Sequence, residues 1–417
     1  MNVGFLGASH LGQVYSAATA MSGMRVSLVD TDDALIEALH TGPTVVEPGL
    51  AEAWQETNSM RSCTTNLDAL SGCQLVFVTR DVPTGDDGES EMSVIEDLIN
   101  GLSRVLVGSG VPVVLMSQVI PGTTRRLSKT YSDLSYQVET LVFGNALHRA
   151  RHPERHIVGV PNQGTQLHPR HREWLSAFPA EQFIMRLESA ELAKIAINLY
   201  LAATVSTTNS LAELARAVGA DWGEIVPTLK ADRRIGPFAY LSPGLGITGG
   251  NIERDLASFL LLSNEFAVRG EVIESFRKNS EYHRQWALRE LKAKGLDGRG
   301  RIGVLGLAYK SDTASTKNSA SLTLLRSLGG QHVRVHDPKV GDIDLPPTAH
   351  RFSRWIDVVS ETEAVVVMTP WPEYSKIDAG TLAGLMKGRL VIDPFAVLDG
   401  KAMRDHGIDY RSLSRSD

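Results

Sequence analysis

The sequence predicts an α/β protein with a doubly wound domain at its N-terminus, a helical spine in its middle and a smaller α/β domain at its C-terminus. Three observations predict this class. The chain opens with a strand–helix–strand unit, a second strand, turn and helix begin at Arg301, and apolar residues recur at helical spacing from about Leu187 to Val218 without a proline. At 417 residues the chain is long enough for two or three domains.

The N-terminal elements alternate between strands and helices. A helix is predicted over 11–22, between the first two strands. The predicted strands are 2–7, Arg25–Val29, Leu75–Thr79 and Val111–Met116. Helical stretches separate them, so we expect a parallel sheet that continues to about residue 145.

The C-terminal part repeats this pattern after the spine. Its first strand and turn are RIGVLGLAYK from Arg301. The further strand candidates are Val333–His336, Ala364–Met368 and Leu390–Ile392.

Composition excludes several classes of protein. A net charge of −6 and a pI near 6.1 argue against nucleic-acid and membrane-surface partners, which select basic faces. Cys63 and Cys73 stand ten residues apart without a CxxC or a histidine cluster, so neither a zinc site nor a disulfide framework is expected. The N-terminus enters a strand directly and no apolar run approaches about 18 residues, which favours a cytoplasmic enzyme.

A glycine-rich turn follows the first strand, where a dinucleotide site belongs. Gly7 permits the tight turn and Gly12 close packing of the helix, while Ser9 replaces the middle glycine. Such a turn also occurs without a ligand. Asp30, eighteen residues after Gly12, adds a carboxylate for the adenosine ribose and favours NAD over NADP, although Arg25 leaves NADP open. The expected cofactor contacts here are Gly7, Ser9, His10, Leu11, Gly12 and Asp30.

Several further motifs occur in a fixed order along the chain. They are Glu47–Leu50 (EPGL), Pro83-Thr84 with Asp87-Gly88, Ser117–Thr124 (SQVIPGTT), Gly144–Ala146, Pro153–Gly159, Ser189-Ala190-Glu191 with Lys194 and Asn198, Asp232–Gly236, Pro243–Gly246, Gly306–Lys310 and Thr369–Trp371. Together they resemble the motifs of the UDP-glucose/GDP-mannose dehydrogenase family, the nucleotide-sugar 6-dehydrogenases, over nearly the whole chain.

The resemblance implies two Rossmann-like doubly wound domains joined by a long central helix that also forms a homodimer. The implied domains are an NAD-binding domain over 1–185, a central helical dimerisation domain with the catalytic loop over 186–295 and a substrate-binding domain over 296–417. It adds Thr79, Ser117 and Lys310 to the expected cofactor contacts. The expected contacts to an anionic substrate are Arg149, Arg155, Arg234, Gly246, Gly249 and Gly250.

The arginines are also open to another interpretation. The stretch His148–His156 and the pair Arg233-Arg234 are basic, and arginine binds phosphate, phosphonate or carboxylate well. A solvated basic loop is the alternative for each of these residues. Their histidines lack the spacing of metal ligands, so no metal is expected.

The family's reaction needs a cysteine that captures an aldehyde before a second hydride leaves. Aligning Gly246–Asp255 with the family's GFGGSCFPKD places Asn251 at the cysteine and Asp255 at the conserved acid, with Arg254 in place of a lysine. Lys194 and Asn198 share a helix face and can converge on one substrate oxygen. Glu139 falls at the family's catalytic glutamate, with a surface glutamate as the alternative.

These substitutions predict a single two-electron oxidation of an alcohol without a thioester. Gln118 and Lys317 also depart from family positions that handle water and substrate. The expected substrate is anionic, either a nucleotide sugar or a small phosphorylated or phosphonate hydroxy acid that then loses CO₂. Two alternatives remain: a four-electron UDP-sugar dehydrogenase that works through an aldehyde hydrate, and a non-catalytic nucleotide-binding protein.

Overall fold

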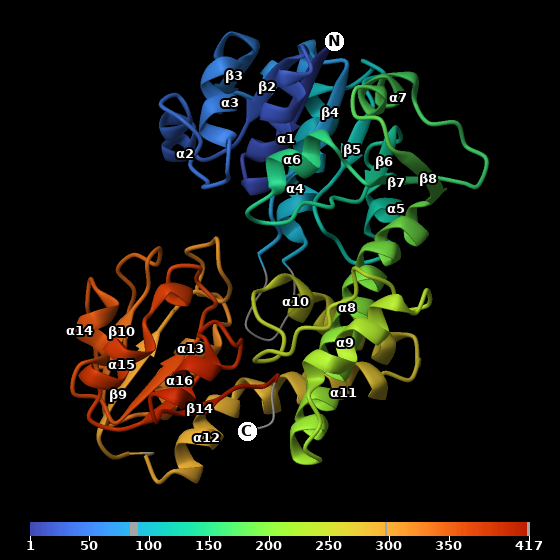
Figure 1. Ribbon diagram of the computed structural model, residues 1–417. Coiled ribbons are helices and arrows are strands. Elements are labelled where there is room, and N and C mark those ends of the chain that lie inside the picture. The colour runs from blue at the N-terminus through green and yellow to red at the C-terminus, as the bar shows by residue number, and fades with distance from the viewer. Residues whose placement is uncertain (84–90, 297, 415–417) are drawn as a thin grey trace. The chain divides into compact units, whose positions relative to one another are not determined.

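The computed structural model describes residues 1–83, 91–296 and 298–414 (Figure 1). The chain divides into two compact units, Met1–Ile197 and Asn198–Asp417, each with its own sheet and core. The division falls inside α8 (Leu187–Ala217), the long helix that the apolar periodicity predicts.

The first unit is built on an eight-stranded sheet in the order β3-β2-β1-β4-β5-β6-β7-β8. All neighbouring strands are parallel except β6 and β7, which are antiparallel. The strands are β1 (Asn2–Leu6), β2 (Arg25–Val29), β3 (Arg61–Thr64), β4 (Leu75–Val78), β5 (Val113–Leu115), β6 (Leu134–Gln137), β7 (Arg155–Val160) and β8 (Glu181–Arg186). The order around β1 is that of a doubly wound fold, in which ligands bind at the carboxyl ends of the strands.

Helices cover both faces of this sheet (Figure 1). Residues of α1, α3, α6 and α7 pack into one buried cluster, and those of α4, α5 and the start of α8 pack into another. The helices before α8 are α1 (His10–Met21), α2 (Asp33–Leu39), α3 (Leu50–Glu56), α4 (Ser93–Val105), α5 (Thr123–Leu127), α6 (Ala146–Arg151) and α7 (Pro169–Ser176); η1 (Asn58–Met60) and η2 (Leu67–Gly72) are short 3₁₀ turns.

The second unit begins with the remainder of α8 and four helices, α9 (Trp222–Ala231), α10 (Asn251–Glu265), α11 (Glu271–Arg284) and α12 (Trp286–Ala293). A six-stranded parallel sheet follows in the order β11-β10-β9-β12-β13-β14. Its strands are β9 (Arg301–Leu305), β10 (His332–His336), β11 (Ala349–Arg351), β12 (Ala364–Val367), β13 (Leu390–Ile392) and β14 (Asp409–Arg411). The helices of this domain are α13 (Ala320–Ser327), α14 (Trp355–Val359), α15 (Ala379–Leu385) and α16 (Gly400–Asp405), with the 3₁₀ turn η3 (Tyr374–Lys376).

The predicted fold class is confirmed, with two doubly wound domains and a long helix. The strands that the sequence pattern predicts all form, to within three residues at either end. The expectation of a parallel sheet that ends near residue 145 is wrong, because β7 and β8 extend it and β7 reverses direction. The sequence of β8, EQFIMR, has neither strict alternation nor a long apolar run, and most of its side chains are exposed, so the apolar pattern did not predict this edge strand.

No helix among the described residues is long and apolar enough to span a membrane.

Candidate active site

The glycine turn after β1 has the geometry that a dinucleotide requires. Gly7 has a φ of +107°, and a Cβ there would lie 2.4 Å from the backbone nitrogen of Arg80. A Cβ on Gly12 would lie 1.9 Å from the Gly7 carbonyl oxygen, so both positions need glycine. The turn ends at the N-terminus of α1, where Ser9 is the N-cap. The backbone N–H groups in the first turn of this helix can bind a pyrophosphate.

Ser9 and Thr79 tie this turn to the end of β4. The Ser9 hydroxyl donates to the Thr79 carbonyl at 2.6 Å, and the Thr79 hydroxyl donates to the Gly7 carbonyl at 2.7 Å. Ser9 therefore takes the place of the missing glycine while holding the turn in a fixed shape.

His10 lies beside the EPGL motif. Its Nε2 is 2.8 Å from Oε1 of Glu47, and its ring packs against Phe143 with centroids 4.3 Å apart. The buried Glu47 carboxylate also accepts hydrogen bonds from the backbone nitrogens of Gly144 and Ala146. Two motifs almost a hundred residues apart in the sequence are thus a single structural element.

Asp30 stands at the end of β2, as predicted, and is buried. Its carboxylate accepts hydrogen bonds from the backbone nitrogens of Ala8 at 2.7 Å and Asp32 at 3.1 Å. Both carboxylate oxygens also lie 3.0 Å from Nη1 of Arg80. Arg80 was not among the residues predicted from the sequence, although its position directly after Thr79, at the end of a predicted strand, was the available signal.

Arg25, which the sequence analysis set against Asp30, lies at the opposite end of β2. Five residues at about 3.3 Å each separate them by about 16 Å. The expectation that Arg25 influences the choice between NAD and NADP is therefore wrong, because strand geometry places it at the other edge of the sheet.

Asp337 occupies the equivalent place in the second unit, after β10. It accepts hydrogen bonds from the backbone nitrogens of Leu307, Ala308, Lys339 and Val340 and from the indole of Trp371. Burial alone would raise its pKa, but these backbone bonds hold the pKa below its usual value. Fixed donors thus occupy this carboxylate, so the ribose-binding role predicted for Asp30 has no equivalent here.

Lys194 and Glu139 come together in the first unit. Nζ of Lys194 donates to the Glu139 carboxylate at 2.5 Å and to its carbonyl oxygen at 3.1 Å. The two side chains are only 12% and 17% exposed. This placement disfavours the surface-glutamate alternative for Glu139.

Glu191, from the SAE motif on α8, is fully buried, and Ser117, which follows β5, is also buried. Its carboxylate accepts hydrogen bonds from the backbone nitrogens of Gly122 at 2.6 Å and Thr124 at 2.8 Å. Burial raises the pKa of Glu191, and these bonds oppose the rise in part. The carboxylate therefore fastens the PGTT loop after β5 to the helix that bears Lys194.

Asn198 and Asp255 form a buried pair in the second unit. Nδ2 of Asn198, on α8, donates to Oδ2 of Asp255, on α10, at 2.5 Å. Asp255 is 1% exposed. Asn198 also stands one helical turn after Lys194 on α8, as the i,i+4 spacing requires.

The glycine loop before α10 leads directly to Asn251, which is exposed at the first position of that helix. Gly246 and Gly249 have positive φ angles of +79° and +84°. A Cβ on Gly246 would lie 2.5 Å from the Ser280 carbonyl oxygen, and one on Gly250 would lie 2.9 Å from Cε of Lys317. At Gly246, where backbone lies this close and φ is positive, only glycine fits, whereas at Gly250 the Lys317 side chain would have to move aside.

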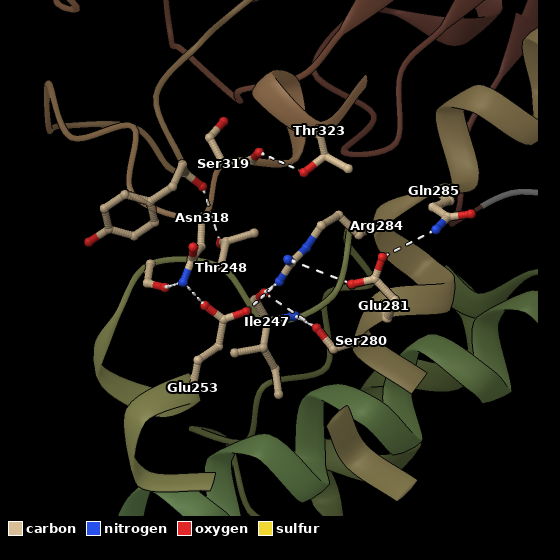
Figure 2. A network of polar contacts seen from close by, with 12 residues as sticks. Ile247, Thr248, Glu253, Ser280, Glu281, Arg284, Gln285, Asn318, Ser319 and Thr323 are labelled. Atoms are coloured by element: carbon tan, nitrogen blue, oxygen red, sulfur yellow. Dashed lines mark hydrogen bonds and ion pairs between the residues drawn. The ribbon is translucent and has the colours of Figure 1, made fainter. Parts of the chain in front are cut away.

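Figure 2 shows the polar network that holds this loop. The Glu253 carboxylate accepts hydrogen bonds from Arg284 on α11 and from Asn318 in the segment before α13. Arg284 also donates to the Ile247 carbonyl at 2.9 Å, and Asn318 donates to the Gly249 carbonyl at 3.1 Å. This network was not predictable from the sequence, because none of these contacts is local in sequence.

The predicted substrate arginines all have acidic partners. Arg149 donates to the Thr140 carbonyl and to Glu154, and Arg155 also donates to Glu154. Arg234, with its side chain 89% exposed, pairs with Asp232. Lys310 lies with Nζ 5.9 Å from the ring centroid of Tyr309. Two carboxylates thus pair with the three arginines, and Arg149 and Arg155 share Glu154.

Thr84, Asp87 and Gly88 of the loop motif lie outside the described residues. Within residues 1–83, 91–296 and 298–414, no three His, Cys, Asp or Glu side chains gather in a way that could hold a metal ion.

Both cysteines belong to the first unit. Cys63 lies within β3, and Cys73 precedes the amino end of β4. Burial raises the pKa of Cys63 and raises that of Cys73 to about 11. Neither thiol is therefore a reactive thiolate near neutral pH.

Family models match three consecutive parts of the chain. They describe the NAD binding domain of the UDP-glucose/GDP-mannose dehydrogenase family over residues 1–174, its central domain over 188–281 and its UDP binding domain over 303–400.

Individual proteins match along their whole length. The chain is 27% identical to the putative UDP-glucose 6-dehydrogenase YtcA of Bacillus subtilis, with 100% of both chains covered. It is 26% identical to the UDP-glucose 6-dehydrogenase TuaD of the same organism, covering 99% of this chain and 93% of the relative.

Solved structures also resemble the fold of this chain. A UDP-glucose dehydrogenase from Pyrobaculum islandicum is 26% identical, with a TM-score of 0.87 over 100% of this chain and 98% of that one. A UDP-D-ManNAc dehydrogenase from Pyrococcus horikoshii shares the fold, with a TM-score of 0.87 at 22% identity over 100% of both chains.

The match of all three domains in order, with the glycine turn and Asp30 in place, leads to one conclusion: the chain belongs to the UDP-glucose/GDP-mannose dehydrogenase family and is an NAD-dependent dehydrogenase that acts on a CH–OH group.

Proposed function

We propose that this protein oxidises an alcohol of a nucleotide sugar in a single two-electron step, without a thioester intermediate. The observation that carries the proposal is Asn251 at the start of α10, at the end of the glycine loop, where the family alignment expects the nucleophilic cysteine. An amide cannot form a thioester. Cys63, which is half-buried, and Cys73, which is buried, both have a raised thiol pKa and offer no substitute.

The residues around the glycine turn suit NAD. The N-terminus of α1 offers N–H groups to the pyrophosphate, and Asp30 offers a carboxylate to the adenosine ribose. NAD held by these residues would supply the acceptor for the hydride that leaves the carbinol carbon.

Lys194 and Asn198 would bind the substrate oxygen, one turn apart on α8. Asn198 uses one of its two amide N–H groups for Asp255, which leaves the second for the substrate. The Lys194 ammonium stabilises the negative charge that develops on this oxygen. Lys194 passes one proton to the Glu139 carboxylate at 2.5 Å and takes the alcohol proton in exchange, so that charge and protons balance.

The nucleotide part of the substrate is supported by the match of residues 303–400 to a UDP binding domain. UDP-glucose is the substrate in the names of the relatives, and it is the first compound to test here. A small phosphorylated or phosphonate hydroxy acid belongs in the same screen, because it would need no nucleotide pocket.

We also propose a homodimer formed through α8. Tyr200, Leu211, Leu214 and Val218 are exposed and recur at helical spacing, so they form one apolar stripe along and just beyond this helix. Leu214→Glu places a charge in that stripe. Analytical ultracentrifugation should then show monomers where the wild type is a dimer; an unchanged sedimentation coefficient contradicts this interface.

Reaction stoichiometry tests the main proposal. The protein is incubated with NAD and each candidate substrate, and NADH formed is compared with substrate consumed. One equivalent is expected, together with a carbonyl product that hydroxylamine traps. Two equivalents and an acid product from UDP-glucose would show four-electron chemistry and overturn the proposal.

A thiol can also be introduced at the critical position. In Asn251→Cys the sulfur stands at the N-terminus of a 15-residue helix, where the helix dipole lowers a thiol pKa. Iodoacetamide should therefore block this variant faster than it affects the wild type. Asn251→Ser, which adds no sulfur, is the matched control and should behave like the wild type.

A further inference from the structure

Arg80 stands on the cofactor turn without a role in the family motifs found in the sequence. It follows Thr79 at the carboxyl end of β4, the strand that pairs with β1. Its backbone nitrogen would be 2.4 Å from a Cβ on Gly7, so its main chain lies directly against the turn.

The Arg80 guanidinium changes what Asp30 can do. A carboxylate has about four acceptor positions. Two backbone N–H groups, from Ala8 and Asp32, bond to the Asp30 carboxylate, and Nη1 of Arg80 lies 3.0 Å from each oxygen. A ribose hydroxyl can therefore donate to Asp30 only if Arg80 gives up one of its contacts with the carboxylate oxygens.

The Arg80 side chain can move away from an Asp30 oxygen, whereas the backbone donors are fixed. Its side chain is 37% exposed, whereas that of Asp30 is 1% exposed. Its contacts with Asp30 run through Nη1, and a guanidinium carries five N–H donors, so it can bind another anion while it remains beside Asp30.

Charge decides the consequence. An unpaired carboxylate at the end of β2 repels a 2′-phosphate and selects NAD, whereas an arginine nearby accommodates that phosphate. Here both groups are present, and Arg80 neutralises the buried charge of Asp30. Arg80 is also the arginine at the correct edge of the sheet, whereas Arg25 stands at the other edge.

We propose that Arg80 is a specificity-determining residue for the cofactor, which weakens the discrimination against NADP that Asp30 alone would impose. The inference rests on NAD binding in the first unit. Asp32 and Asp33 follow Asp30 in the sequence and add negative charge, but they are present in every variant, so their effect cancels when the ratio of affinities is compared between variants.

Binding rather than turnover provides the test. The dissociation constants of NADH and NADPH are measured by titration calorimetry for the wild type, Arg80→Ala and Arg80→Lys. Removing the cation should raise the ratio of the NADPH constant to the NADH constant by about 10-fold, while lysine keeps the charge and should hold the ratio within about threefold. Arg25→Ala is the matched control and should leave the ratio unchanged.

Each result has a distinct meaning. An unchanged ratio in Arg80→Ala, with thermal melting showing that the variant is folded, overturns the role of Arg80. An equal weakening of both cofactors also overturns it, because that result indicates a structural effect on the turn. A wild type that binds neither cofactor contradicts the cofactor assignment itself and this inference with it.

Discussion

The buried pair of Asn198 and Asp255 allows a quantitative test of the active site. Asn198→Ala removes the amide that donates to the Asp255 carboxylate at 2.5 Å, and Asp255 is 1% exposed. A hydrogen bond to a charged group contributes about 1.5–3 kcal/mol. If the transition state loses all of this hydrogen-bond energy in the variant, kcat/KM should fall by about 10- to 150-fold.

A double-mutant cycle separates this contact from general damage. Asp255→Asn keeps the shape and an acceptor oxygen but removes the charge, and the pair Asn198→Ala with Asp255→Asn closes the cycle. The expected coupling energy is about 1.5–3 kcal/mol in kcat/KM. Steady-state kinetics with NAD and the best substrate supply all four values.

The matched control is Asn279→Ala, which removes an exposed hydrogen bond from the Asn279 amide on α11 to the Ser210 hydroxyl on α8. It should change kcat/KM by less than about 0.5 kcal/mol. If the losses of Asn198→Ala and Asp255→Asn simply add, the two side chains act independently and the reasoning from their contact is refuted.

Three further predictions concern the supports of the site. Glu253→Gln removes one acceptor from the network of the glycine loop and should lower kcat about 3- to 10-fold, with faster proteolysis of the loop; unchanged values for both would contradict the positioning role. Glu191→Gln leaves one buried N–H of the loop after β5 without its acceptor, so urea unfolding should show a loss of about 1–3 kcal/mol; no loss would mean that solvent reaches this loop. Burial raises the pKa of Asp393 to about 6, so its contribution to stability is fully present below its unfolded pKa near 4 and is lost as pH rises through 6. Asp393→Asn should therefore lose the fall in melting temperature between pH 4 and 6 and melt higher than the wild type at pH 7; the exposed Asp342→Asn should retain the wild-type profile.

The family motifs acquire their physical meaning only in three dimensions. In the sequence, EPGL and Gly144–Ala146 are separate, as are SAE and PGTT. In the structure Glu47 and Glu191 each fasten one such loop through backbone N–H groups. These carboxylates hold the loops at the edge of the sheet where the cofactor is expected.

The elements of the fold were available from the sequence by itself, because the period of apolar residues and the glycine at a tight turn are local properties of the chain. That is why α8, the strand ends at Asp30 and Thr79, and the turn from Gly7 to Gly12 could be predicted. The absence of a cysteine at position 251 is equally a property of the sequence.

The partners of the charged side chains were decided only by tertiary structure. Nothing local indicates that Arg80 reaches Asp30, fifty residues away, or that Glu139 rather than solvent meets Lys194. The same holds for Glu253, whose partners come from a helix and a loop some thirty and sixty-five residues further on. Long-range pairing depends on how strands are ordered and helices packed, and the chemistry of a charged group depends on which partner that packing supplies.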